Sequence, residues 1–374
     1  MMDKSAQKAL IDALTQHQAY LFRASSQSVN ELVRRFNSLS NAQLQRLSEL
    51  LEELTDSERN ALKSLNFGSR SKASKRIEEI KTILDEWFNS IDMDLSEKFH
   101  KSTLDLAIYE AAYTAKLAGD ASVVVAGAEI YKTARKTPFA GGQLVDYLFA
   151  DIAASLRKKV EYVIRDGISQ GQTNQQIVQR IKGRKSLDYK DGLLESSRSS
   201  IERQVRTVRS HVANVAYEET YKALGFTHLK FIATLDGRTS KTCGSLDQTV
   251  WKVGDSSIRR PPLHPNCRSV LVGVDADGNL SGVRPFVMDE RKVKDIPKGE
   301  RKHLIGQLDA NTSFKEFFDQ ADDFFQQEWL GPSRYKLYKQ GEYAIDKFVD
   351  PQGRMYTLSE LRALDTKTFK ELGL

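Results

Sequence analysis

The sequence predicts an α+β fold that is predominantly helical. A long helix is expected to pack on a small antiparallel or mixed sheet, between a helical N-terminal half and a helical C-terminal tail. In the first half, apolar residues recur at intervals of three and four, which places them on one face of a helix. Runs rich in β-branched and aromatic residues are concentrated in 227–274, and helical spacing returns from about 285 onward.

The composition is that of a globular protein with a polar surface. Its 374 residues are enough for two or three domains, with 40% apolar and 28% charged residues. The 56 basic and 50 acidic residues leave a net charge of +6, which permits contact with DNA or an acidic partner without requiring it. We predict four regions, namely a helical region 1–130, a helical segment with a linker 131–197, a core 198–280 and a helical tail 281–374.

The cellular compartment is predicted from two features that the sequence does not show, a signal peptide and a membrane-spanning segment. Its first residues do not show the charged start, apolar centre and cleavage site of a signal peptide. The longest apolar run, 121–128, is far shorter than the roughly 20 residues that span a bilayer. We therefore expect synthesis in the cytosol, where the two cysteines would not form a lasting disulfide.

The N-terminal helices are predicted from three apolar stripes, over 29–39, 44–54 and 77–87. Ser40 and Thr55 each stand three residues before a Gln or Glu, so each is predicted to cap the start of a helix. The stripes indicate helix-on-helix packing. The sequence does not show the unbroken heptads of a sustained coiled coil.

The middle of the chain contains helix signals and one polar stretch. Gly167 is predicted to end a helix, and Thr173 to cap a short one with Gln176. The polar stretch 184–200 is the predicted linker, followed by a long helix over 201–225 with a buried valine stripe.

Strands and tail helices follow this long helix. Three strands are predicted, within 227–235, 250–253 and 268–274. In the tail, Gly331 is predicted to separate two helical runs. After a turn at 351–353, Thr357 is predicted to cap a last helix with Glu360.

The loops between the strands contain the residues with the most chemistry. Cys243 and Cys267 are the two cysteines of the chain, and His264 stands three residues before the second, on a loop restricted by prolines. One interpretation is a structural zinc site with these three residues as ligands. The fourth ligand would then be water or one of Asp236, Asp247 and Asp255.

Three other interpretations stay open. In the first, which we favour, the cysteines are small buried hydrophobes, His264 donates to a backbone carbonyl, and Arg238 and Arg268 pair with Asp236 and Asp247. In the second, His264 activates a cysteine nucleophile. In the third, His264 is the general base of a nuclease with Arg238 or Arg268 as a phosphate clamp, although the sequence has no dense acidic array for two metal ions.

The order of the motifs resembles the phage head-morphogenesis domain, the family of phage Mu protein F and related minor head proteins. The resemblance extends over roughly 135–365 and leaves the first 130 residues unassigned. The motif residues are, in chain order, Arg206, Thr207, Asp236, Arg238, Thr239, Cys243, Asp247, Trp251, Pro262, His264, Asn266, Cys267 and Arg268.

The resemblance implies a minor head protein of a tailed phage, without enzymatic activity. Such a protein binds at the portal vertex in head assembly and takes part in DNA packaging or delivery. The implied partners are the portal protein, the major capsid or scaffolding protein and double-stranded DNA, with no membrane. The implied location is the host cytoplasm during assembly and then the inside of the virion head. The alternative is a phage-encoded nuclease that uses His264 with Arg238 and Arg268.

Two further expectations bear on the site and the partners. Relatives often carry additional cysteines at the positions of Ser240 and Ser269, so a four-cysteine zinc site is not expected in this chain. The amphipathic helices of 20–130 are predicted to form the docking surface, because the apolar face of a helix can fill a partner's groove.

Overall fold

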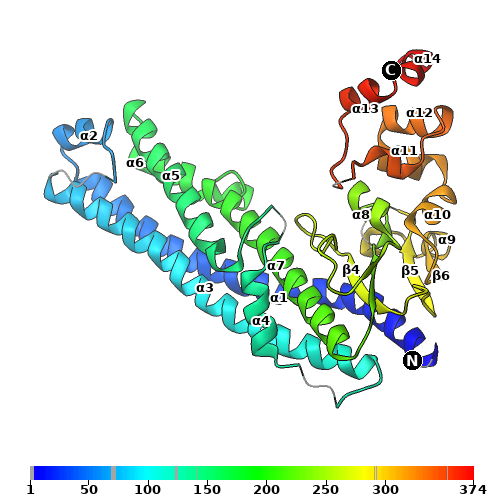
Figure 1. Cartoon of the computed structure of the whole chain (residues 1–374). Coiled ribbons are helices and arrows are strands. Elements are labelled where there is room, and N and C mark those ends of the chain that lie inside the picture. The colour runs from blue at the N-terminus through cyan, green and yellow to red at the C-terminus, as the bar shows by residue number, and fades with distance from the viewer. Residues whose placement is uncertain are drawn as a thin grey trace. The chain divides into compact units, whose positions relative to one another are not determined.

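The computed structural model confirms a predominantly helical α+β fold (Figure 1). It describes residues 4–68, 73–122, 125–139, 141–289, 291, 293–351 and 353–374, and their side chains except those of 4–16, 18, 19 and 22. The described residues form helices α1 to α14 and two three-stranded sheets. No described helix is long and apolar enough to cross a membrane.

The chain divides into two compact units, and α1, α3 and α7 each contribute to both. The sheet unit consists of Met1–Phe22, Leu106–Thr133 and Ser210–Leu374. The helical unit consists of Arg23–Asp105 and Ala134–Arg209. The helices that build the helical unit are α1 (Lys4–Glu53), α2 (Asp56–Leu62), α3 (Lys75–Leu117), η1 (Val145–Tyr147), α5 (Leu148–Ser169), α6 (Asn174–Lys182), η2 (Lys185–Leu187) and α7 (Leu193–Ala223).

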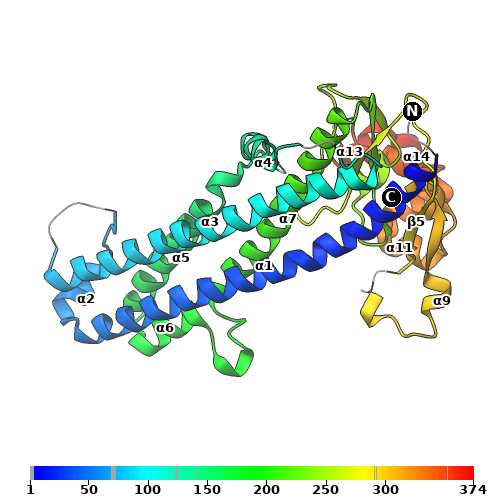
Figure 2. The same cartoon turned by 90° about the horizontal axis from the view of Figure 1, so that it is seen from below.

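In the helical unit, α1 and α3 run antiparallel, side by side (Figure 2). Arg35 forms two hydrogen bonds of 2.7 Å with Asp94, and the Trp87 indole donates to Ser40 Oγ at 3.2 Å. All three predicted stripes contribute buried residues, which confirms that they form helix-on-helix core.

The predicted helix start at Ser40 is wrong, because α1 continues through this position without a break. Ser40 is completely buried, and its hydroxyl accepts the hydrogen bond from Trp87. A buried indole N–H needs such a partner, and a serine on the facing helix supplies it.

Gly167 was expected to end a helix, but it lies inside α5. A Cβ at this position would stand 2.6 Å from Ile177 Cγ1, so the glycine allows α5 and α6 to approach closely. The predicted linker 184–200 is also partly wrong, because α7 begins at Leu193. The segment before it is held by Arg184, which pairs with Asp191 at 2.6 Å.

The predicted capping boxes at Thr55, Thr173 and Thr357 are confirmed. In each box, the threonine hydroxyl accepts from the third backbone N–H of the helix, and a Glu or Gln side chain returns to the threonine N–H.

Thr173→Ala is expected to lower the free energy of unfolding by about 1 kcal/mol, because one backbone N–H of α6 loses its partner. The matched control is Thr82→Ala, an exposed threonine within α3 whose hydroxyl donates to Glu78 O. Urea unfolding measures both. An equal loss in both variants would contradict the assignment of the cost to the cap.

The sheet unit contains the first, predicted sheet, in the order β3-β1-β4 and fully antiparallel. Its strands are β1 (His228–Ile232), β3 (Val250–Lys252) and β4 (Val270–Val274), within the three predicted segments. The β4 strand is held to α7, because Asn214 Oδ1 accepts from Leu271 N at 3.2 Å.

A second sheet, in the order β2-β5-β6, was not predicted. Its strands are β2 (Leu235–Asp236), β5 (Val283–Val287) and β6 (Ile305–Asp309), with β2 parallel to β5 and β6 antiparallel to it. β5 reads Val-Arg-Pro-Phe-Val, so Arg284 and Pro285 disrupt the apolar pattern that would identify a strand.

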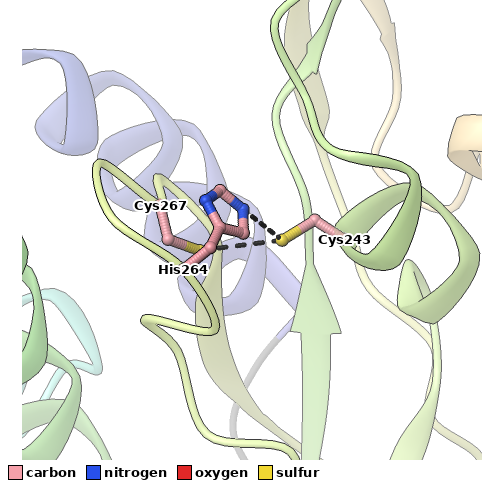
Figure 3. Close-up of side chains that lie close together, drawn as sticks. All are labelled: Cys243, His264 and Cys267. Carbon is pink, nitrogen blue, oxygen red and sulfur yellow. Dashed lines mark hydrogen bonds between the residues drawn. The ribbon is translucent and has the colours of Figure 1, made fainter. Parts of the chain in front are cut away.

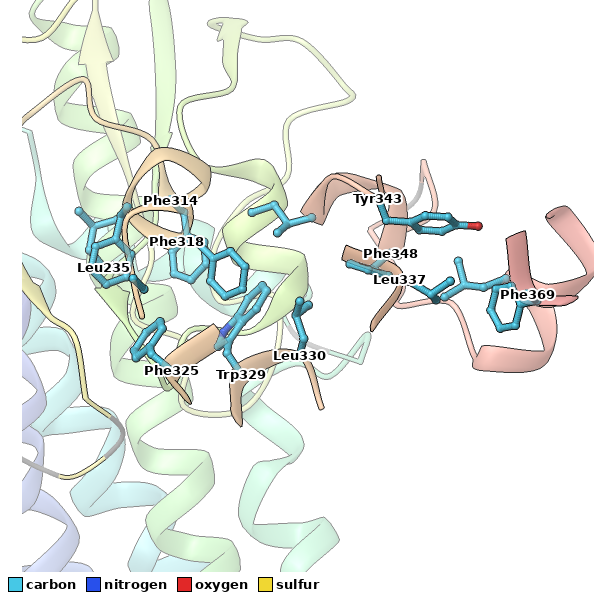
Figure 4. Close-up of a cluster of buried hydrophobic side chains, with 14 residues drawn as sticks. Leu235, Phe314, Phe318, Phe325, Trp329, Leu330, Leu337, Tyr343, Phe348 and Phe369 are labelled. Atoms are coloured by element: carbon cyan, nitrogen blue, oxygen red, sulfur yellow. The ribbon is translucent and has the colours of Figure 1, made fainter. Parts of the chain in front are cut away.

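The C-terminal part is built around an aromatic cluster that contains Phe314, Phe318 and Trp329 (Figure 4). The break at Gly331 is confirmed, since α11 ends before it and α12 begins after it. Gln352, in the predicted turn at 351–353, lies outside the described residues. The helices not yet named are α4 (Gly127–Lys136), whose residues are divided between the two units, and the following helices of the sheet unit: α8 (Lys241–Leu246), η3 (Val293–Asp295), α9 (Arg301–Leu304), α10 (Phe314–Asp319), α11 (Asp323–Leu330), α12 (Pro332–Gln340), η4 (Ile345–Phe348), α13 (Leu358–Leu364) and α14 (Thr366–Leu372).

A buried polar cluster joins α1, α3 and α7 within the sheet unit. His17 Nε2 lies 3.0 Å from both carboxylate oxygens of Glu110, and the Tyr217 hydroxyl donates to Glu110 Oε2 at 2.9 Å. Glu110 is fully buried, and the imidazole stacks on Tyr113 with ring centroids 4.0 Å apart. Burial and the neighbouring Glu110 raise the pKa of Tyr217 well above its ordinary value, so the phenol stays protonated.

Candidate functional site

Cys243, His264 and Cys267, which we call the Cys-His group, converge in the sheet unit (Figure 3). Cys243 comes from α8, and the other two from the loop before β4. The two sulfur atoms are 3.7 Å apart, and Cys243 Sγ lies 3.3 Å from His264 Nε2. Both cysteines are buried and free of disulfides. The structure thus brings together the three residues that the sequence singled out as metal ligands.

Local backbone structure sets the positions of these side chains. Ser240 begins α8, and its hydroxyl accepts from Cys243 N at 3.1 Å. In the loop, Asn266 has a φ of 59°, a left-handed conformation that asparagine tolerates better than most residues. The turn is closed by Cys267 N, which donates to His264 O at 3.1 Å. Pro262, also in the predicted motif, is buried at the start of this loop.

The hydrogen bonds of His264 fix the orientation of its ring. Nδ1 lies 3.0 Å from Pro265 O, and because a carbonyl oxygen can only accept, Nδ1 is the donor. The predicted donation from His264 to a backbone carbonyl is therefore found. Nε2 faces Cys243 and also lies 2.9 Å from Ser240 Oγ.

The hydrogen bond between the two cysteines shifts their pKa values in opposite directions. The hydrogen bond from Cys243 lowers the pKa of Cys267 well below its ordinary value; burial opposes this shift, and His264 adds to it. The same hydrogen bond and burial raise the pKa of Cys243. The hydrogen bond with Cys267 in turn raises the pKa of His264. Cys267 is therefore the cysteine of the pair that ionises more readily.

A second cluster, which we call the Asp236 cluster, contains Asp236, Arg238, Thr239 and Arg268. Arg268 forms a bidentate pair with the Asp236 carboxylate, and Arg238 Nη2 donates to Asp236 Oδ2 at 3.1 Å. Thr239 Oγ1 donates to Asp236 Oδ1 at 3.2 Å. Burial raises the pKa of Asp236, but the hydrogen bonds and charges of Arg268 and Arg238 outweigh it and hold the pKa below its ordinary value. The predicted pairing of both arginines with Asp236 is confirmed.

Asp247 does not pair with Arg238 or Arg268, so that part of the prediction is wrong. Its carboxylate binds Arg284 of β5 at 2.9 Å and accepts from Ala233 N and Phe314 N, both at 2.7 Å. Both charged side chains are almost completely buried. Asp247 therefore joins the end of β1, the strand β5 and the start of α10.

The other motif residues lie elsewhere. Arg206 and Thr207 belong to the helical unit, where Arg206 pairs with Glu202 and Thr207 Oγ1 donates to Arg203 O at 2.7 Å. Trp251 is half-buried in β3, opposite Leu229 of β1.

Three sets of contacts around these clusters were not predicted from the sequence. Arg284 could have been suspected as an arginine inside an apolar strand. Ser240 and Ser269 both hydrogen-bond to Cys243, and the additional cysteines that relatives often carry at these two positions were a signal that they lie beside the site. Trp329 Nε1 donates to Thr239 O at 2.7 Å, a contact across 90 residues that no local pattern indicates.

The Cys-His group, the Asp236 cluster and the first sheet lie toward the C-terminal end of a segment that matches a protein family. Residues 158–272 match the model of the family described as phage Mu protein F like protein. The predicted resemblance is confirmed over these residues, a shorter span than the predicted 135–365. No curated protein and no solved structure matches the chain.

The phage Mu protein F like segment begins within α5 and ends within β4. It includes β1, β3 and the start of β4, together with the Cys-His group and the Asp236 cluster.

Proposed function

We propose that the chain is a minor head protein of a tailed phage, which acts by binding at the portal vertex during head assembly. The observation that supports this most is the match of residues 158–272 to the phage Mu protein F like family. In this proposal the protein is located in the host cytoplasm during assembly and then inside the virion head. Its partners are the portal protein and the major capsid or scaffolding protein.

The geometry of the site favours a binding role over the nuclease alternative. A nuclease would need Arg238 or Arg268 to hold a phosphate, but both guanidinium groups bind the Asp236 carboxylate. His264 would have to be a free general base, but its ring faces Cys243, Ser240 and a backbone carbonyl. These side chains hold two loops together, which suits a protein that acts as a rigid binding element.

We propose a docking surface on the helical unit that does not use the apolar stripes of α1 and α3. The apolar stripes on α1 and α3 face the core and cannot contact a partner. A partner would instead meet exposed apolar side chains of the helical unit, among them Met93 and Tyr162. We include double-stranded DNA as a salt-sensitive partner, because the net charge is +6.

Quantitative mass spectrometry of purified, DNA-filled virions tests the proposal by counting this chain relative to the portal protein. We expect a few copies per particle. If the chain is missing from every such particle, the minor head role is wrong.

A nuclease assay provides the comparison with the alternative function. The purified chain, incubated with duplex DNA and Mg²⁺, is expected to leave the DNA intact. Cleavage by the wild type that disappears in an equally folded His264→Ala variant would replace the binding role by the nuclease role.

A further inference from the structure

We propose that Cys243, Cys267 and His264 bind one zinc ion through their Sγ, Sγ and Nε2 atoms, with a water molecule as the fourth ligand. The first support is that the three ligand atoms already lie within 4.8 Å of one another, without any carboxylate in the group among the described residues. Two thiolates and an imidazole are a donor set that selects zinc over magnesium or calcium.

Two of the three distances between the ligand atoms match the edges of a zinc coordination sphere, and the third, between Cys267 Sγ and His264 Nε2, is within 4.8 Å. Zinc bonds of about 2.3 Å to sulfur and about 2.0 Å to nitrogen give tetrahedron edges of about 3.8 Å between sulfurs and about 3.5 Å from sulfur to nitrogen. The observed distances are 3.7 Å between the sulfurs and 3.3 Å from Cys243 Sγ to His264 Nε2. A zinc ion therefore needs only small shifts of these side chains.

The surroundings of His264 also match those of a metal-bound histidine. Such histidines donate their second ring N–H to a carbonyl or carboxylate, which fixes the ring and presents the other nitrogen to the metal. His264 does this through Nδ1 and Pro265 O, so Nε2 is the nitrogen that faces the sulfurs.

The acidic residues expected as a fourth ligand are committed to other contacts. Asp236 binds two arginines, Asp247 binds Arg284, and Asp255 accepts from Ser257 N at 2.7 Å. Ser240 Oγ, 2.9 Å from His264 Nε2, lies beside the open position and can hydrogen-bond a zinc-bound water.

A zinc ion here would connect the loop before β4 to α8, on which the C-terminal part is built. A Cβ at Gly244 of α8 would stand 2.8 Å from the Phe314 ring, and Thr242 Oγ1 donates to Gly353 O at 2.6 Å. Holding α8 in place would therefore stabilise contacts far along the chain.

Metal analysis of the purified full-length chain tests the proposal. We expect about one zinc per chain, and a fall to background in Cys243→Ser, Cys267→Ser and His264→Ala. Ser245→Ala is the matched control, because it removes a hydroxyl on the same helix α8 that donates to Thr242 O and supplies no ligand atom. It should keep the full zinc content.

A cobalt titration of the metal-free wild type avoids any doubt about the folding of the variants. We expect saturation at one Co²⁺ per chain, with thiolate-to-cobalt charge-transfer absorption and the intense visible bands of tetrahedral cobalt. If neither zinc nor cobalt binds the wild type stoichiometrically, or if the three ligand variants keep their zinc, the proposal is wrong.

Discussion

Asp247→Ala is expected to lower the free energy of unfolding by about 3–5 kcal/mol, the usual cost of removing one partner from a buried ion pair. The substitution leaves the Arg284 guanidinium, whose side chain is 1% exposed, without its counter-charge. It also leaves the backbone N–H groups of Ala233 and Phe314 without their acceptor. The loss should be largest in the sheet unit, because Asp247 connects both of its sheets to α10.

Urea unfolding combined with hydrogen exchange of β1 and β5 measures this effect. Asp255→Ala, at an exposed position, is the control and should change stability by less than about 0.5 kcal/mol. The double variant Asp247→Ala with Arg284→Met removes both charges and should recover part of the loss. If the double variant is less stable than Asp247→Ala alone, the uncompensated charge is not the cause.

Trp329→Ala is expected to cost about 3–5 kcal/mol, because it removes a large side chain from the C-terminal aromatic cluster. The indole is 2% exposed, with ring centroids 5.1 Å from Phe314 and 4.8 Å from Phe318. Its Nε1 donates to the backbone of Thr239, so the variant also leaves a buried carbonyl without its donor.

Hydrogen exchange of residues 313–374 is the sharpest measurement of this change. Phe324→Ala, on the same helix but 74% exposed, is the control and should have little effect. Trp329→Phe keeps the aromatic packing but not the hydrogen bond, and should cost only about 0.5–1.5 kcal/mol. Equal exchange in Trp329→Ala and Phe324→Ala would show that the cluster does not depend on this tryptophan.

Much of the fold could be predicted because it depends on local rules. The apolar stripes identify the buried faces of α1 and α3, and the capping boxes at Thr55, Thr173 and Thr357 mark true helix starts. The three residues of the Cys-His group could be singled out from their chemistry. His264 and Cys267 are close in sequence, and few other residue types have their chemistry.

The errors come from residues whose role depends on distant partners. Ser40 has the local pattern of a helix start, but burial against Trp87 overrides it. Arg284 makes β5 look unlike a strand, although its charge is neutralised by Asp247, 37 residues earlier. Asp247 was paired with the wrong arginine because the second sheet was not expected. In each case a tertiary contact determines the role of the residue, and the spacing of residues in the sequence does not reveal that contact.

The buried cluster of His17, Glu110 and Tyr217 has a consequence for the alignment of the long helices. Apolar stripes on α1, α3 and α7 would still meet if one helix slid along another by a turn, about 5.4 Å. Such a slide would strand the Glu110 carboxylate in an apolar environment, away from the imidazole and the phenol that bind it. The three polar groups therefore select one axial register from several that hydrophobic packing alone would accept.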